Sequence, residues 1–223
     1  MNPIITLDKS HTLFNEQIGE HYHSTFGAIQ ESEHIFIGAG LKHIFNNKSD
    51  INILEIGFGT GLNALLTLKF ARGHNLKTNY HGIEAFPISI EQAMMLNYPE
   101  LIGIEQDVFI KMHESGEENK AISRSFVLKK SLIKLEDTKL PENFFDLVYF
   151  DAFSPDSQPE LWTEEIFQKI YDSMRTDSIL TTYSCKGIVK RALKSAGFQI
   201  EKLPGPPGKR EFLRALKGKD RLR

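Results

Sequence analysis

The stretch of residues 51–63, INILEIGFGTGLN, limits what this chain can fold into more than any other. It begins with closely spaced β-branched and aliphatic residues, a pattern typical of a strand buried in a parallel sheet. A glycine-rich turn over 57–61 follows, and helical spacing of apolar residues continues over 62–70. Glycine lets the backbone approach a ligand closely, and the helix N-terminus behind the turn offers unpaired N–H groups. The order of strand, glycine turn and helix therefore predicts a nucleotide-cofactor cradle in an α/β fold.

The spacing within the turn indicates which cofactor fits. No lysine follows Gly61, which excludes the phosphate-binding Walker A loop. The glycines are spaced G-x-G-x-G, one residue short of the dinucleotide fingerprint. Glu55, just before the turn, could hold a cationic amino-acid group, and Glu84, at the end of the next predicted strand, could accept both hydroxyls of a ribose. This combination resembles the S-adenosylmethionine site of class I methyltransferases; the alternative is a structural turn without a ligand.

Candidate contacts to this cofactor come from the turn, from the two acidic residues and from a segment ahead of the first long helix. They are Tyr22, Ser24, Glu55, Gly57, Phe58, Gly59, Thr60, Gly61, Asn63 and Glu84. Tyr22 and Ser24 are interpreted as lid or pocket residues, or else as part of a packed segment before the helix. The neighbouring His21 and His23 lack a third histidine or a carboxylate at ligand spacing, so no metal site is predicted.

Composition describes an ordinary globular protein. The chain has 223 residues, of which 40% are hydrophobic and 25% charged. No apolar stretch approaches the ~20 residues of a membrane span, and the N-terminus lacks the apolar core of a signal peptide. The single cysteine, Cys185, excludes an internal disulfide. These features predict a cytoplasmic protein with no membrane association.

Charge is distributed unevenly along the chain. The formal net charge is only −2, yet residues 186–223 alone carry +9. A basic end on an acidic body is expected where a polyanion docks on one face. The final residues, KGKDRLR, fit a solvated tail equally well. Lys209 and Arg210 differ, because they lie between a Pro-Gly-rich stretch and a strand-like run over 211–216.

Strands and helices alternate through most of the chain. Expected strands cover 51–56, 80–84, 125–135, 144–150 and 178–183, with a terminal antiparallel hairpin of 198–203 and 211–216; expected helices cover 29–45, 62–72, 87–96, 159–174 and 186–196. This order predicts a Rossmann-like sheet of seven strands, with residues 1–48 as an extension over the cofactor site and 49–223 as the main domain. Residues 97–124 allow only a possible helix over 101–112, and the third strand offers no clear carboxylate for an adenine.

Asp151 is the leading candidate for chemistry. It follows the apolar strand 144–150, and ligands of open parallel sheets bind beside the carboxyl ends of the strands. The alternative is an N-cap for the following helix.

Several stretches together resemble one family, the methyltransferase module of the bacterial enzyme that makes 5-methylaminomethyl-2-thiouridine in tRNA. They are Tyr22-His23-Ser24 with Gly27-Ala28, Glu31 and His34-Ile35-Phe36-Ile37; Glu55 to Asn63; Glu84 with Pro87; Asp151-Ala152-Phe153-Ser154-Pro155 with Pro159-Glu160-Leu161-Trp162; and Pro204-Gly205 with Lys209-Arg210-Glu211. The resemblance implies methylation of the primary amine of 5-aminomethyl-(2-thio)uridine at the tRNA wobble position. The best-known family form carries a flavin-dependent oxidase, but no G-x-G-x-x-G segment is present, so no FAD domain is expected in this chain. A separate oxidase or upstream enzyme would then supply the amine.

The reaction so implied needs a neutral amine, because a protonated one has no free electron pair. Asp151 would orient the amine and accept its proton. The candidate contacts to the anticodon stem-loop of the tRNA are Phe153, which could stack on the wobble base or simply pack in the core, and Pro155, Lys186, Arg191, Lys209 and Arg210. Two alternatives stay open: a class I methyltransferase acting on another amine, in a small molecule or a protein, and a non-catalytic RNA-binding protein on the same fold.

Overall fold

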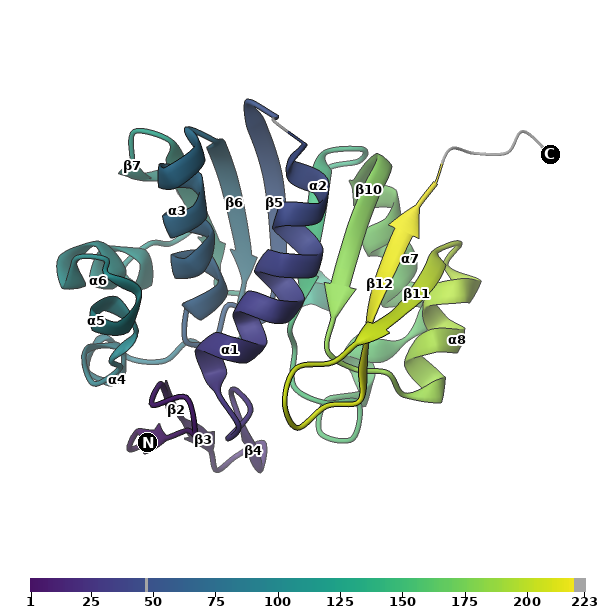
Figure 1. Ribbon diagram of the computed structural model, residues 1–223. Coiled ribbons are helices and arrows are strands. Elements are labelled where there is room, and N and C mark those ends of the chain that lie inside the picture. Colours follow the sequence, from purple (N-terminus) through teal and green to yellow (C-terminus); the bar gives the residue numbers. More distant parts are fainter. Residues whose placement is uncertain (47, 219–223) are drawn as a thin grey trace.

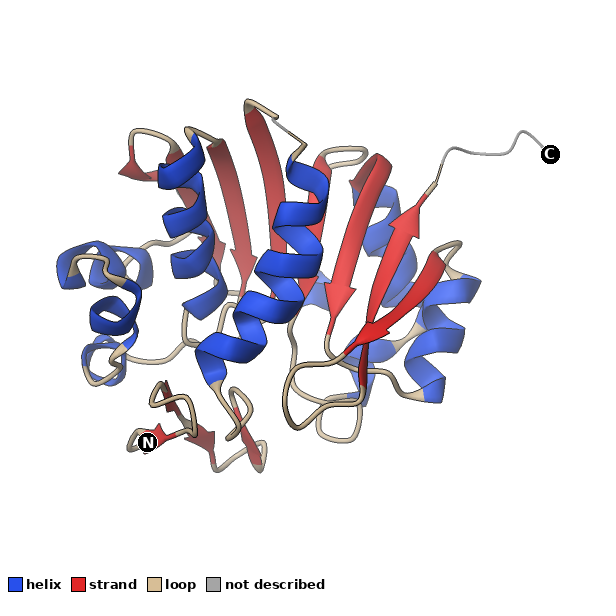
Figure 2. Ribbon diagram, in the orientation of Figure 1, coloured by secondary structure: helices blue, strands red, loops and turns tan. Residues whose placement is uncertain are grey.

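A single twisted sheet of eight strands forms the centre of the computed structural model, which describes residues 1–46 and 48–218 (Figures 1 and 2). The strands are β5 (Asp50–Ile56), β6 (Lys77–Ile83), β7 (Lys120–Ser123), β8 (Phe126–Ser131), β9 (Phe145–Phe150), β10 (Met174–Thr182), β11 (Gln199–Pro204) and β12 (Glu211–Lys217). Their order is β11-β12-β10-β9-β5-β6-β8-β7. The five middle strands from β10 to β8 are parallel, whereas β7, β11 and β12 pair antiparallel.

Helices cover both faces of the sheet (Figure 1). They are α1 (Ala28–Ser32), which continues through a π-helical stretch (Glu33–Lys42) into α2 (His43–Phe45), α3 (Leu62–His74), α4 (Ile90–Met94), α5 (Tyr98–Ile102), α6 (Gln106–His113), α7 (Glu164–Ser173) and α8 (Gly187–Ser195), with 3-10 turns at Leu135–Asp137 and Pro159–Trp162. The long helix α1–α2 and α3 lie on one face, and α7 and α8 lie on the other. Two small hairpins, β1 (Ile4–Ile5) with β2 (His11–Thr12) and β3 (Phe14–Asn15) with β4 (Glu20–His21), precede the long helix.

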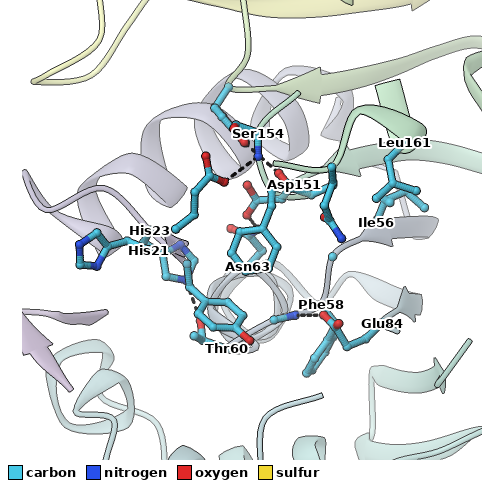
Figure 3. A pocket seen from close by; sticks show the side chains of 18 of the residues that line it. His21, His23, Ile56, Phe58, Thr60, Asn63, Glu84, Asp151, Ser154 and Leu161 are labelled. Atoms are coloured by element: carbon cyan, nitrogen blue, oxygen red, sulfur yellow. Dashed lines mark hydrogen bonds between the residues drawn. The ribbon is translucent and has the colours of Figure 1, made fainter. Parts of the chain in front are cut away.

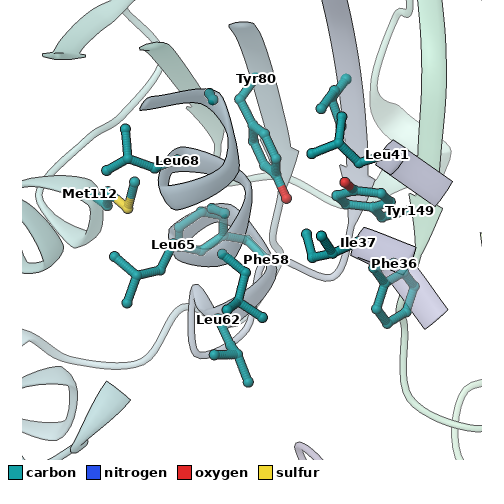
Figure 4. Packing of buried hydrophobic residues seen from close by; sticks show 14 of the residues in the cluster. Phe36, Ile37, Leu41, Phe58, Leu62, Leu65, Leu68, Tyr80, Met112 and Tyr149 are labelled. Carbon is teal, nitrogen blue, oxygen red and sulfur yellow. The ribbon is translucent and has the colours of Figure 1, made fainter. Parts of the chain in front are cut away.

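Successive side chains along a strand point to opposite faces of the sheet, and they form one hydrophobic core on each face. In β9, Leu147 and Tyr149 join the cluster under the long helix, whereas Val148 and Phe150 join the cluster under α7 and α8. Figure 4 shows side chains of the long helix and of α3 meeting over Tyr80 and Tyr149. The rings of Phe36 and Tyr149 pack edge to face at 5.4 Å, a geometry worth about 1 kcal/mol beyond its buried area. With both faces covered, β9 is buried throughout and β5 is buried from Ile51 to Ile56, as their apolar runs predict.

The expected parallel sheet is confirmed, but the predicted number of seven strands is wrong. The eighth strand is β7, a short edge strand that pairs antiparallel with β8. Only Ile122 of β7 is buried, so the sequence carries no alternating pattern there.

Local hydrogen bonds move several predicted helix boundaries. The helix expected over 87–96 begins at Ile90, because Ser89 and Gln92 form a capping box with bonds of 3.2 and 2.9 Å. The possible helix over 101–112 is two helices, since Gly103 takes a left-handed conformation and ends α5. The helix expected over 159–174 is likewise divided, because the Thr163 side chain caps α7.

Two predictions concern membrane association and the C-terminal end of the chain. None of the helices in 1–46 and 48–218 is long and apolar enough to span a membrane. The interpretation of KGKDRLR as a solvated tail concerns residues 217–223, most of which lie outside the described part of the chain.

Candidate active site

A cavity of about 410 Å³ opens at the carboxyl ends of β5, β6 and β9 (Figure 3). Its floor is the glycine turn after β5 and the segment that begins at Asp151. One wall is the loop that follows β8, residues 133–136, and another is the segment 20–26 ahead of the long helix. The cavity therefore lies where open parallel sheets bind their ligands.

The glycine turn and the Asp151 turn touch each other. Gly57 has a φ of +85°, and a Cβ there would lie 2.6 Å from the carbonyl oxygen of Asp151. The Asp151 N–H donates to the Ile56 carbonyl at 2.9 Å. Only glycine allows this approach, so the turn brings the predicted cofactor cradle against the predicted catalytic residue.

Glu84 is held as a hydrogen-bond acceptor beside the turn. Its carboxylate oxygens accept the N–H groups of Gly59, at 2.7 Å, and Phe86, at 2.8 Å. Burial raises the pKa of Glu84, and these two bonds oppose that rise. Each oxygen keeps a further lone pair, so the carboxylate can still receive the hydroxyls of a ribose.

The loop after β8 supplies the wall that the sequence left undefined. Residues 133–136 line the cavity, including Glu136. Phe58 and Phe86 also line it, and flat apolar side chains of this kind suit an adenine ring. The short 3-10 turn Leu135–Asp137 places Glu136 there, which no strand pattern could reveal.

Glu55 does not line the cavity, so the expectation of a direct contact with a cationic ligand is wrong. Its side chain is completely buried beneath the floor. The Asn63 amide donates to Glu55, at 3.0 Å, and to Asp151, at 2.8 Å. Burial raises the pKa of the Glu55 carboxyl well above its usual range. Glu55 therefore orients Asn63, which in turn orients Asp151.

Asp151 is an unusually basic aspartate. Burial raises its pKa, the nearby Glu31 carboxylate raises it further, and the opposing effects of the Asn63 hydrogen bond and of Lys209 leave it at about 7. Perturbed carboxyl groups in a cleft are typical of residues that transfer protons.

The segment after Asp151 is held from three elements. The Tyr183 hydroxyl donates to the Ala152 carbonyl at 2.9 Å, and the Trp162 indole N–H donates to the Phe153 carbonyl at 2.9 Å. The Ser154 N–H donates to Glu20 of β4 at 2.8 Å (Figure 3). Because its backbone groups are occupied, this turn presents a fixed geometry to a substrate.

The N-terminal segment reaches both turns. The Tyr22 ring packs edge to face on Phe153 at 5.0 Å, and it also covers Gly59, where a Cβ would lie 3.1 Å from the ring. His23 lies 2.6 Å from the Thr60 hydroxyl, and burial lowers the pKa of this histidine to about 4, so it is neutral near pH 7. The lid interpretation of Tyr22 and Ser24 agrees with their place in the cavity wall.

The structure brings together most of the predicted site residues. Those that line the cavity are Tyr22, Ser24, Gly57, Phe58, Gly59, Thr60, Asn63, Glu84, Asp151, Phe153 and Lys209. Gly61, Pro155, Lys186, Arg191 and Arg210 do not line it.

The residues outside the cavity have other neighbours. Pro155 is buried, which argues against its predicted contact with tRNA. Lys186 forms an ion pair with Asp156. Arg191 lies on a separate shallow groove with Lys190, Lys194 and Lys202.

Sequence reasoning missed several polar residues of the cavity as site candidates, among them Glu20, Glu31 and Tyr183. Glu31 lay within a stretch that carried the family resemblance, which was the one available signal. Glu20 and Tyr183 carry no local pattern, because only the fold brings them to the cavity.

The parallel sheet, the glycine turn after β5 and the acidic residue Glu84 after β6 define a class I methyltransferase. A model of the S-adenosyl-L-methionine-dependent methyltransferases matches residues 107–218, and the chain belongs to this family. Its cofactor is S-adenosylmethionine, and the cradle fits it, since Gly57 leaves the space that a Cβ would fill and Glu84 keeps free lone pairs.

Named relatives add detail. The tRNA 5-methylaminomethyl-2-thiouridine biosynthesis bifunctional protein MnmC of Paracidovorax citrulli is 29% identical over 216 residues, which cover 92% of this chain and 34% of that protein. The chain thus spans about a third of the length of the curated relatives it matches. The crystal structure of MNMC2 from Aquifex aeolicus superposes with a TM-score of 0.78 at 29% identity, covering 96% of this chain and 70% of that one. Spermidine synthase from Thermotoga maritima, with a TM-score of 0.54, 14% identity and coverage of 92% and 67%, shares the fold.

Proposed function

We propose that this chain transfers a methyl group from S-adenosylmethionine to the primary amine of 5-aminomethyl-(2-thio)uridine at the tRNA wobble position. The observation that carries the proposal is Asp151, a carboxyl of raised pKa that lies against the cofactor turn. The names of the relatives support tRNA as the substrate. The reaction would take place in the cytoplasm, and a separate oxidase or another upstream enzyme would supply the amine.

The cradle residues have distinct tasks toward the cofactor. Glu84 would accept the ribose hydroxyls, and Phe58 and Phe86 would pack on the adenine. Asn63, which lines the cavity, would fix the Asp151 carboxylate, and Glu55 beneath the floor would hold Asn63. S-adenosylmethionine supplies an electrophilic methyl carbon bound to a sulfonium.

Asp151 would prepare the amine for attack. The substrate arrives as an ammonium, and Asp151 takes one of its protons, which frees the nitrogen electron pair. The N–C bond then forms as the S–C bond breaks, and the product nitrogen keeps the positive charge as a secondary ammonium. The proton on Asp151 later passes to water. A carboxyl with a pKa of about 7 loses less free energy in this transfer than an ordinary aspartate would.

Recognition of tRNA would use an aromatic side chain and a basic surface. Phe153 lines the cavity and could stack on the extruded wobble base. Arg191, with the lysines of its groove, and Arg210, which is exposed, would contact phosphates. Residues 1–48 would act as an extension over the cofactor site of the domain 49–223, a proposal supported by the contacts of Glu20 and Tyr22.

A methylation assay with labelled S-adenosylmethionine tests the function. The substrates are tRNA from cells that accumulate the 5-aminomethyl nucleoside, the free nucleoside, and tRNA that already carries the methylaminomethyl group. We expect label only in the first, located by mass spectrometry of the wobble nucleoside. Equal methylation of the free nucleoside, or of unrelated amines, would contradict the proposal.

A further inference from the structure

A partly buried ion pair, between Lys209 and Glu31, lies in the wall of the cavity that also holds Asp151. The ammonium nitrogen of Lys209 is 2.9 Å from the carboxylate oxygen Oε1 of Glu31. Glu31 is only 8% exposed, and both residues line the same cavity as Asp151. The Lys209 nitrogen also lies 4.3 Å from the centre of the Tyr183 ring. Lys209 was predicted to bind tRNA phosphates, but its ammonium group is paired with Glu31 in the cavity wall.

Local hydrogen bonds hold both partners in place. The second carboxylate oxygen of Glu31 accepts the Ser24 N–H at 3.0 Å. Lys209 sits in a tight turn, where its own N–H donates to the Pro206 carbonyl at 2.9 Å. The Glu31 carboxylate is thus anchored through Ser24, and the backbone of Lys209 is anchored through Pro206, in the wall of the cavity that Asp151 also lines.

We propose that Glu31 and Lys209 are positioning residues for methyl transfer, whose opposed charges set how readily Asp151 takes a proton from the substrate ammonium. The inference rests on the proposed function. A nearby negative charge makes a carboxylate bind a proton more tightly, and a nearby positive charge has the reverse effect. Glu31 thus makes Asp151 a stronger base, and Lys209 limits that gain.

The other groups that face Asp151 are not free to play this part. Asn63 of α3 is neutral and donates a hydrogen bond to it. Tyr80 of β6 and Tyr183 after β10 have pKa values that burial raises well above the usual range, so both stay neutral. Burial likewise raises the pKa of Glu55 on β5, which favours its uncharged form. Glu31 and Lys209 are the charged partners that can be altered separately.

The test compares E31Q and K209M, two substitutions of similar size to the native side chains. Single-turnover methylation of the 5-aminomethyl tRNA is measured against pH. The rise of the rate on the acid side should move down by about one pH unit in E31Q and up by about one unit in K209M. K209R, which keeps the cation, should keep the wild-type midpoint. A purely structural defect would lower the rate at every pH without moving the midpoint in opposite directions.

A second measurement separates this inference from the proposed function. The Asp151 carboxyl is titrated by carbon NMR in the cofactor-loaded wild type and in both variants, without tRNA. Opposite shifts of the Asp151 titration midpoint in the two variants support the inference. If the wild type also fails to methylate tRNA, only the proposed function is wrong. Unchanged midpoints in both variants overturn the inference, whether or not tRNA is methylated.

Discussion

The two sides of the cavity are built in different ways. The cofactor side uses one continuous stretch, 57–63, together with Glu84. Its closest contacts are made by backbone N–H groups and by glycines, which have no side chain to block a close approach. The acceptor side brings together the side chains of Glu31, Asp151 and Lys209 from remote parts of the chain. A backbone site depends on local conformation, whereas a side-chain site depends on the whole fold and its charges. Substitutions on the two sides should therefore fail in different ways.

The largest expected effect is on the acceptor side. Asp151→Asn keeps the size of the side chain but removes the proton acceptor, so the rate of methyl transfer should fall by about 10³-fold. Affinity for S-adenosylmethionine, measured by calorimetry, should stay within a few-fold of wild type, because the glycine turn is untouched. Turnover close to wild type would remove Asp151 from the mechanism and leave the two sides undistinguished.

The reverse pattern is expected from Gly57→Ala. The added Cβ would lie 2.6 Å from the Asp151 carbonyl oxygen, at a φ of +85°. Relief of that clash must distort the turn, and calorimetry should show cofactor affinity reduced about 100-fold, or about 2.7 kcal/mol.

Gly73→Ala is the matched control for this substitution. Gly73 lies in α3, and nothing lies within 4 Å of the Cβ it would gain. The control should keep full affinity, since alanine suits a helix interior. Equal losses in both variants would mean that α3, and not the close approach of the two turns, governs binding.

The same contrast explains how far sequence reasoning could reach. The cofactor side was largely predictable, because strand, glycine turn and helix follow one another directly and Glu84 comes immediately after the next long strand, β6. Glu55 was the exception on this side. Its position beside the turn suggests a ligand, but its side chain points under the floor toward Asn63.

The acceptor side was predictable only in Asp151 and Phe153. Asp151 directly follows an apolar strand and Phe153 stands two residues further on, so both carry a local signal. Lys209 stands in a basic stretch, and charge counting could not show that Glu31 meets it inside the cavity. The edge strand β7 was missed for a similar reason, because its partner β8 and not its own pattern defines it.

A smaller effect concerns stability, and on the acceptor side it comes from the raised pKa of Asp151. The pKa of Asp151 is about 7 in the folded protein against an ordinary 3.8, so the folded state binds this proton more tightly than the unfolded chain does. Its contribution to stability is therefore present below about pH 4 and is lost as the pH rises through 7. The Asp151→Asn variant has no carboxyl group to ionise, so its stability does not fall in this way as the pH rises. The full pKa shift corresponds to about 4 kcal/mol of unfolding free energy. Because water in the open cavity screens the charge, we expect about 2 kcal/mol of this difference to be measured.

Urea unfolding measures this gain. The variant should be more stable than wild type at pH 8, and the difference should shrink toward pH 5. An equal difference at both pH values would mean that the gain does not come from the ionisation of Asp151. The expected result would make Asp151 a residue that improves catalysis at a cost in stability.

The smallest effect is expected where the N-terminal segment joins the two sides. Glu20→Ala removes the acceptor of the Ser154 N–H, a charge-assisted bond of 2.8 Å at the end of the Asp151 turn. The loss of about 1 kcal/mol should raise the KM for tRNA about 5-fold and leave cofactor affinity unchanged. Glu20→Gln keeps a neutral acceptor and should lie between wild type and Glu20→Ala. If Glu20→Ala instead weakened cofactor binding, the segment would belong to the cofactor side, and the division of the cavity would have to be redrawn.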